Sequence, residues 1–155
     1  MKFHPIRKDH GGKLWCGLAA LSTVSGFGTR YCLDHIKESS KEIGFGPRRV
    51  MGIYYDEIIQ AFHHLSYKTE PLVKFKARDP LAPNLIQWIF DTCNRKSTLP
   101  EGIILIADDT HYMVTDGRIL VCSVRPEGCD ISEHPHWRRK MHAAWMITEV
   151  KCEDL

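Results

Sequence analysis

Cys16 is the first residue whose surroundings suggest catalytic chemistry. It stands in the stretch KLWCGLAA (residues 13–20), where small and apolar residues that can begin a helix follow it directly. A helix N-terminus carries unpaired N–H groups and a partial positive charge, which favour a thiolate and would stabilise the oxyanion formed when sulfur attacks a carbonyl. Gly17 leaves room for a substrate beside the backbone. Cys16 is therefore a candidate nucleophile; the competing interpretation is a core residue, because free cysteine is among the most buried residue types.

A nucleophilic cysteine needs a general base, and the chain holds 9 histidines. The best placed is His111, which begins the strand-like stretch HYMVT after the acidic pair Asp108 and Asp109. At the edge of a strand its imidazole can face a cleft. The other candidates in the middle and late parts of the chain have ordinary structural explanations: His63, His64, His134, His136 and His142.

The sequence also predicts which residue would orient His111. Asp116-Gly117 is a strong signal for a two-residue hairpin turn, and this turn would pair His111 directly with Cys122 on the next strand. Directly opposed residues share one face of a sheet, with Cβ atoms about 5 Å apart. Position 122 is therefore the expected place of the orienting side chain.

The elements that must position these residues divide the chain into two parts. Apolar spacing predicts helices over 16–25, 29–43 and 54–65, then an extended segment over 66–77. A Pro-rich loop (76–84) leads into a further helix over 84–96. Strand patterns follow at 102–109, 111–115 and 118–124; after a turn-rich stretch (125–137), residues 140–150 return as a last strand or as a short helix.

This order predicts an α+β fold, in which N-terminal helices pack on a C-terminal antiparallel β-sheet. With 155 residues, the chain fits one domain spanning 1–155. A cysteine at a helix start in the first half can thus face a histidine from the second half. The six cysteines are expected to be reduced thiols, because no secretory signal accompanies them.

The order of these motifs resembles the papain-like cysteine peptidase fold, and most closely a group of small papain-like proteins of phages and related mobile elements. Those proteins carry an early cysteine-to-helix segment, a PTL-QW helix and a hairpin of the form H-x-V-x-V-x-D-G-x-x-x-D. Their counterparts here are KLWCGLAAL, PNLIQWI and HYMVTDGRILVC. The resemblance covers most of residues 10–125.

The resemblance implies roles for individual residues. Cys16 matches the nucleophile and His111 the general base, whereas the third position, Asp or Asn in the pattern, falls on Cys122. A thiol orients an imidazole less well than a carboxylate does. His10 occupies the place of the Gln that commonly donates to the oxyanion. Asp109 is the alternative orienting residue, and Trp15 would wall the substrate groove beside Gly17, unless Trp15 belongs to the core.

Three functional interpretations follow. The first is a thiol-dependent acyl-transfer hydrolase of the cysteine peptidase, isopeptidase or amidase type, acting on a protein or peptide substrate without a cofactor or metal. The second is a catalytically weak or inactive papain-like protein that binds a host protein, as a phage factor would. The third is a zinc site, for which the ligands would be Cys122, Cys129, His134 and His136.

Composition excludes other classes. A formal net charge of +2 with scattered basic residues argues against a nucleic-acid partner. No apolar run approaches the roughly 20 residues of a membrane span, and the N-terminal stretch lacks the apolar segment of a signal peptide. We therefore expect a cytoplasmic protein. If a phage encodes it, the compartment would be the cytoplasm of the bacterial host.

Overall fold

The computed structural model describes residues 2–44, 53–76, 79–85, 87–89, 91, 102–108, 111–151 and 153. Three helices come first: α1 (Cys16–Ser25), α2 (Thr29–Glu42) and α3 (Tyr55–His64). They confirm the three predicted N-terminal helices to within one residue at each end. α1 ends because Gly26 takes a left-handed conformation (φ 78°) and donates its N–H to the Ser22 carbonyl.

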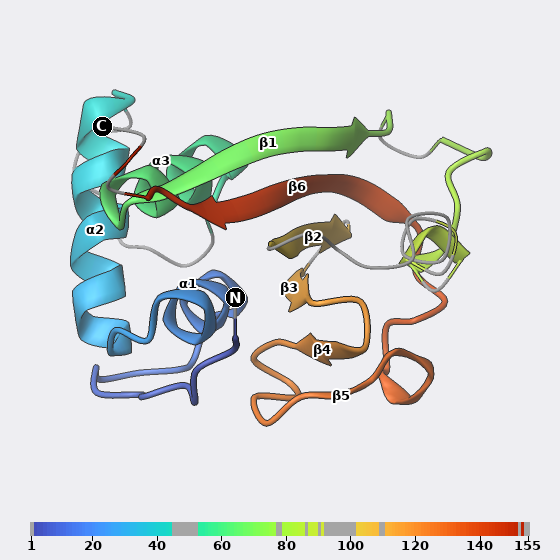
Figure 1. The fold of residues 1–155 in the computed structure, drawn as a ribbon, viewed down its shortest axis with the longest axis horizontal. Coiled ribbons are helices and arrows are strands. Elements are labelled where there is room, and N and C mark those ends of the chain that lie inside the picture. The colour runs from blue at the N-terminus through green and yellow to red at the C-terminus, as the bar shows by residue number, and fades with distance from the viewer. Residues whose placement is uncertain are drawn as a thin grey trace.

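A six-stranded antiparallel sheet completes the fold, in the strand order β1-β6-β2-β3-β4-β5. Its strands are β1 (Tyr67–Lys74), β2 (Ile103–Asp108), β3 (Tyr112–Thr115), β4 (Ile119–Val121), β5 (Cys129–Asp130) and β6 (Met141–Glu149). A 3₁₀ turn, η1 (Ile131–Glu133), separates the last two. Figure 1 shows the strands in this order from the top of the view to the bottom, with α1 and α2 at the left. The α+β prediction is confirmed, and residues 140–150 do return as a strand.

The central strand β2 is buried on both faces of the sheet. Ile103, Leu105 and Ala107 belong to the core cluster that includes residues of the three helices. Ile104 and Ile106 point the other way, into a second cluster with Leu85 and Ile89. Side chains alternate along a strand, so a continuous apolar run is what a strand covered on both sides requires. Residues 85, 87–89 and 91 are helical, which agrees with the start of the helix predicted over 84–96; residues 92–96 lie outside the described part of the chain.

The β3–β4 hairpin corrects one prediction. Thr115 pairs with Leu120 and Val114 with Val121, so residues 116–118 and the first residue of β4, Ile119, lie between the last paired positions, and His111 does not face Cys122 directly. The two-residue turn is not formed because the Asp116 side chain accepts the N–H groups of Arg118 and Ile119 at 2.9 and 3.1 Å, which stabilises a wider loop.

The corrected register is shifted by two residues, and an even shift leaves every side chain on its predicted face. Cys122 and Met113 accordingly pack in the same cluster, on the face opposite α1, α2 and α3. Within the described ranges, no helix is long and apolar enough to cross a membrane.

Candidate functional site

The candidate site lies where three strands meet at one end of the sheet. β2 ends at Asp108, β3 begins beside it after His111, and β4 ends just before Cys122. The Asp108 N–H donates to the His111 carbonyl at 3.1 Å, which holds the connection between β2 and β3 closed at this point. Antiparallel pairing therefore brings the predicted base, His111, and the predicted orienting residue, Cys122, to the same end of the sheet.

Cys16 reaches this edge from α1. It is the first residue of the helix, after the N-cap Trp15, and α1 packs against β3. Burial raises the pKa of the Cys16 thiol, whereas backbone N–H groups of Tyr112, Gly17 and Cys16 itself face the sulfur and oppose the rise; nearby Asp108 raises it further. The expected help from the helix N-terminus is present, but desolvation outweighs it. Cys16 is thus a neutral thiol at rest.

His111 is half-buried beside the same backbone. Burial lowers the pKa of its imidazole, the neighbouring His136 and Arg139 lower it further, and Asp108 opposes them. Its Nε2 atom is buried and makes no hydrogen bond to any residue that the structure describes. A neutral imidazole with a free ring nitrogen can accept a proton.

The link between Cys16 and His111 runs through Tyr112. The Tyr112 N–H faces the Cys16 sulfur, and Tyr112 directly follows His111 in the chain. No hydrogen bond joins the two side chains themselves among the described contacts. The thiol and the imidazole therefore approach the same end of the sheet through the backbone of Tyr112, and they do not form a preformed ion pair.

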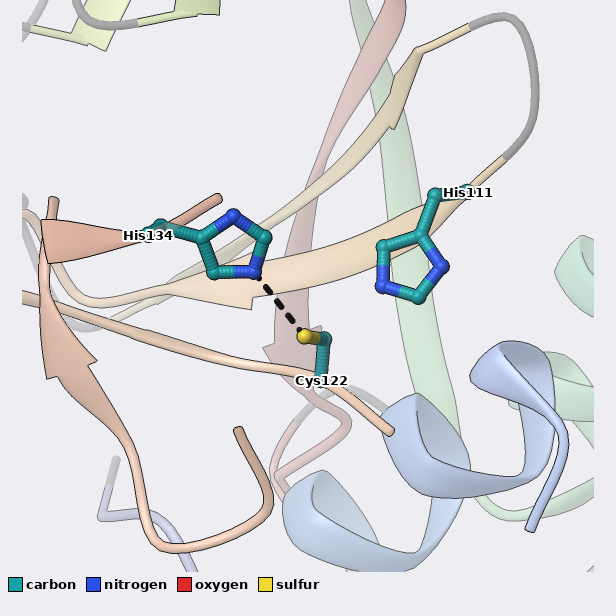
Figure 2. A group of neighbouring side chains, drawn as sticks. All are labelled: His111, Cys122 and His134. Atoms are coloured by element: carbon teal, nitrogen blue, oxygen red, sulfur yellow. Dashed lines mark hydrogen bonds between the residues drawn. The ribbon is translucent and has the colours of Figure 1, made fainter. Parts of the chain in front are cut away.

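Cys122 contacts His134, which the sequence analysis named as a possible zinc ligand and not as part of a catalytic group. Its Sγ lies 3.0 Å from Nε2 of His134, and both side chains are wholly buried. Figure 2 shows the Cys122 sulfur between the imidazoles of His134 and His111. One ligand atom from each of these three residues lies within 4.8 Å of the other two. We call His111, Cys122 and His134 the His–Cys–His cluster.

The hydrogen bonds of His134 fix its tautomer. The His136 backbone N–H donates to His134 Nδ1 at 3.0 Å, so Nδ1 is an acceptor and the proton of the neutral ring is on Nε2. That proton points to the Cys122 sulfur. Burial, followed by the nearby His136 and His111, lowers the pKa of His134 to about 4, so the ring is neutral at pH 7.

The Cys122 sulfur lies in a backbone turn. Cys122 and Arg125 exchange backbone hydrogen bonds at 3.3 and 3.2 Å, and the N–H groups of Arg125 and Val124 face the sulfur. Burial raises the pKa of this thiol, and these two N–H groups oppose the rise. The sulfur is thus surrounded by donors.

The remaining predicted residues do not take the roles that the sequence suggested for them, or lie outside the described residues. His10 is buried with both ring nitrogens engaged: Nδ1 contacts the Thr29 hydroxyl at 2.6 Å and Nε2 donates to the Lys13 carbonyl at 3.0 Å. Its N–H is therefore already used. Trp15 is half-buried against the helical core, and the space beside Gly17 is filled by the Ile53 side chain. Asp109, the alternative orienting residue, lies outside the described residues.

The zinc ligands predicted from sequence are only partly brought together. Cys122 and His134 are neighbours, but His111 completes the group in place of Cys129, which is half-buried on β5. His136 turns toward the end of β2, with Nδ1 3.4 Å from Asp108 Oδ2. The sequence already placed Cys122 and His134 in one group; the member it missed is His111, and the signal for it was the face that His111 shares with Cys122 in the hairpin.

No protein-family model, curated protein or solved structure matches the chain. The interpretation of the site therefore depends on the geometry of its own residues.

Proposed function

We propose that the protein is a thiol-dependent acyl-transfer hydrolase with a papain-like arrangement, in which Cys16 is the nucleophile and His111 the general base. The observation that carries this proposal is the position of Cys16 at the first residue of α1, with the N–H of Tyr112, the neighbour of His111, directed at its sulfur. The order of motifs in the sequence supports it independently. The substrate class is a protein or peptide carbonyl in an amide, isopeptide or thioester, met in the cytoplasm.

The protonation states at rest determine the mechanism. With the pKa of Cys16 raised and that of His111 lowered, the pair begins as thiol and neutral imidazole. His111 then takes the thiol proton as sulfur attacks the carbonyl carbon, and the carbonyl π electrons move to oxygen. N–H groups at the start of α1 stabilise this oxyanion. The intermediate expels the amine or thiol, which takes the proton from His111, and water hydrolyses the thioester in a second round.

A binding protein is the second candidate. The observation that favours it is the third position of the site, where a buried thiol stands instead of a carboxylate or amide. A thiol stabilises an imidazolium less well, so catalysis at this site would be weak. In that case the edge of the sheet would serve to bind a host protein.

Alkylation of Cys16 tests the first candidate without knowledge of the substrate. We would measure iodoacetamide labelling of each cysteine at pH 7.5 by peptide mass spectrometry, in the parent protein, His111→Gln and His63→Gln. His63, an exposed histidine of α3, is the matched control. If His111 is the base, His111→Gln slows labelling of Cys16 by roughly 10²-fold, the low end of a general-base contribution. His63→Gln leaves the rate unchanged. Equal Cys16 labelling in all three proteins would contradict the hydrolase and favour the binding protein.

A further inference from the structure

We propose that His111, Cys122 and His134 form a binding site for a thiophilic divalent cation of the Zn²⁺ class. Two imidazoles and one thiolate are ligands that zinc takes in proteins, and three protein ligands leave a fourth position for water. The three candidate ligand atoms already lie within 4.8 Å of one another.

The free ring nitrogen of His111 is an independent reason to expect a ligand here. Its Nε2 is buried and has no hydrogen-bond partner among the described residues. Buried polar atoms are satisfied in nearly all native proteins, so this nitrogen calls for a partner that the described residues do not supply. The neighbours of this imidazole include the Cys122 sulfur and the rings of His134 and His136, whose centroids lie 6.3 and 5.0 Å from that of His111. Two imidazole nitrogens and a thiol sulfur are ligands for a cation rather than for an anion.

The turn after Cys122 places two backbone donors at its sulfur, and they oppose the burial that raises the pKa of this thiol. A metal ligand must be a thiolate, and the N–H groups of Val124 and Arg125 face the sulfur, where they stabilise negative charge. These donors belong to the backbone of a hydrogen-bonded turn, so they remain in place when the proton leaves. Cys129, by contrast, is not a member of the group, although its sequence position suggested one.

Cation binding requires a defined movement of protons. The Cys122 S–H proton leaves to solvent as the sulfur–metal bond forms. His134 must free Nε2, so its proton moves to Nδ1, and the hydrogen bond from the His136 N–H, now 3.0 Å long, is lost. The backbone at His136 therefore has to find another acceptor for its N–H when the cation binds.

A bound cation would also regulate the proposed reaction. Coordination uses the His111 nitrogen that would otherwise accept the Cys16 proton, so the cation and the base role exclude each other. This consequence rests on the proposed function; the existence of the site does not. Binding itself is measured without reference to catalysis, so failure of either idea is recognised separately.

A cadmium titration of the reduced, metal-free full chain tests the site. Cd²⁺ is a thiophilic stand-in for Zn²⁺, and its bond to a thiolate produces a charge-transfer absorption band in the ultraviolet. We expect the band to saturate at one equivalent in the parent protein. In Cys122→Ser the band is lost. In His134→Gln and His111→Gln the affinity falls by more than the roughly 10–100-fold that loss of a second-shell partner costs.

Cys129→Ser is the matched control, because it removes a half-buried thiol of the adjacent strand outside the cluster. It should keep the band and the affinity of the parent protein. Circular dichroism verifies that each variant is folded. If a substitution at buried Cys122 or His134 unfolds the chain, His111→Gln, at a half-buried position, tests the site in its place. A parent protein without the band, a band that survives in Cys122→Ser, or one that depends on Cys129 would overturn the proposal.

Discussion

His134 Nε2 lies 3.0 Å from Cys122 Sγ, although 12 residues separate the two along the chain. Cys122 stands where the papain-like pattern described above has a carboxylate or an amide. The contact puts the His134 imidazole behind this thiol. His134 donates to the sulfur, since its Nδ1 accepts the His136 N–H. The two side chains therefore act as one hydrogen-bonded unit, and their substitutions should not be additive in stability.

The pH dependence of stability follows from the burial of this unit. An unfolded histidine takes up a proton near pH 6.5, whereas folded His134 does so only near pH 4. Between these values the unfolded chain binds more protons, so the metal-free protein loses stability as the pH falls from 6.5 to 4. The loss from His134 is at most about 3 kcal/mol.

Urea unfolding at several pH values between 4 and 7 measures this loss. His134→Gln should remove part of the slope, while the lowered pKa of His111 leaves a remainder of the same sign. His63→Gln, at an exposed position, should leave the slope as it is. A slope identical in the parent protein and His134→Gln would show that the buried ring is already protonated or not buried in solution.

Thiol reactivity should separate Cys32 from Cys129. Cys32 is wholly buried on α2, and burial raises its pKa to about 11, so about one thiol in a thousand is ionised at pH 8. Cys129 is half-buried on β5. Iodoacetamide at pH 8 should therefore label Cys129 first, as peptide mass spectrometry would report. Labelling in denaturant, where both react alike, is the control. Native-state labelling of Cys32 at the rate of Cys129 would mean that α2 opens readily.

Much of the fold could be predicted because apolar periodicity reflects which face is buried. α1 and α2 follow from their spacing, and Gly26 marks the end of the first helix. The pairing of β1 with β6 could not be predicted in the same way. The apolar pattern of a strand does not indicate which strand pairs with it, and this pair joins Tyr67 to Glu149 across more than half of the chain. Only the completed sheet shows it.

The candidate site was predictable in part for a similar reason. The face shared by His111 and Cys122 survives an error of two residues in register, because side chains alternate with period two. The contact of Cys122 with His134 depends on how a turn-rich segment folds back, which no periodic pattern encodes. The raised pKa of Cys16 depends on burial by distant segments, and a sequence motif does not report it.

Gly17→Ala should disturb the start of α1. A Cβ at this position would overlap the side chain of Ile53, whose carbonyl accepts the Tyr112 hydroxyl at 2.9 Å. Because the overlapping atom is the flexible end of Ile53, we expect a cost of about 1 kcal/mol, the low end for overpacking. Gly11→Ala is the matched control, since nothing lies within 4 Å of the place that its new Cβ would occupy and its backbone is not left-handed. Equal stabilities in urea would mean that Ile53 does not pack on α1.

The loop before β4 should depend on one carboxylate oxygen. Asp116 Oδ1 accepts the N–H groups of Arg118 and Ile119 at 2.9 and 3.1 Å, and these contacts favour the wider connection over a two-residue turn. Asp116→Ala removes both and should lower the free energy of unfolding by about 1–2 kcal/mol. Asp116→Asn keeps an acceptor oxygen, so its free energy of unfolding should fall by less than half as much as that of Asp116→Ala.

Urea unfolding of the two variants measures the difference, and cadmium titration of Asp116→Ala adds a readout at the site. If the loop sets the register of β4, its loss also moves Cys122 and weakens cation binding, while Asp116→Asn binds as the parent protein does. Two variants with the stability of the parent protein would mean that β3 and β4 keep their register through strand pairing alone, and that Asp116 has no part in positioning Cys122.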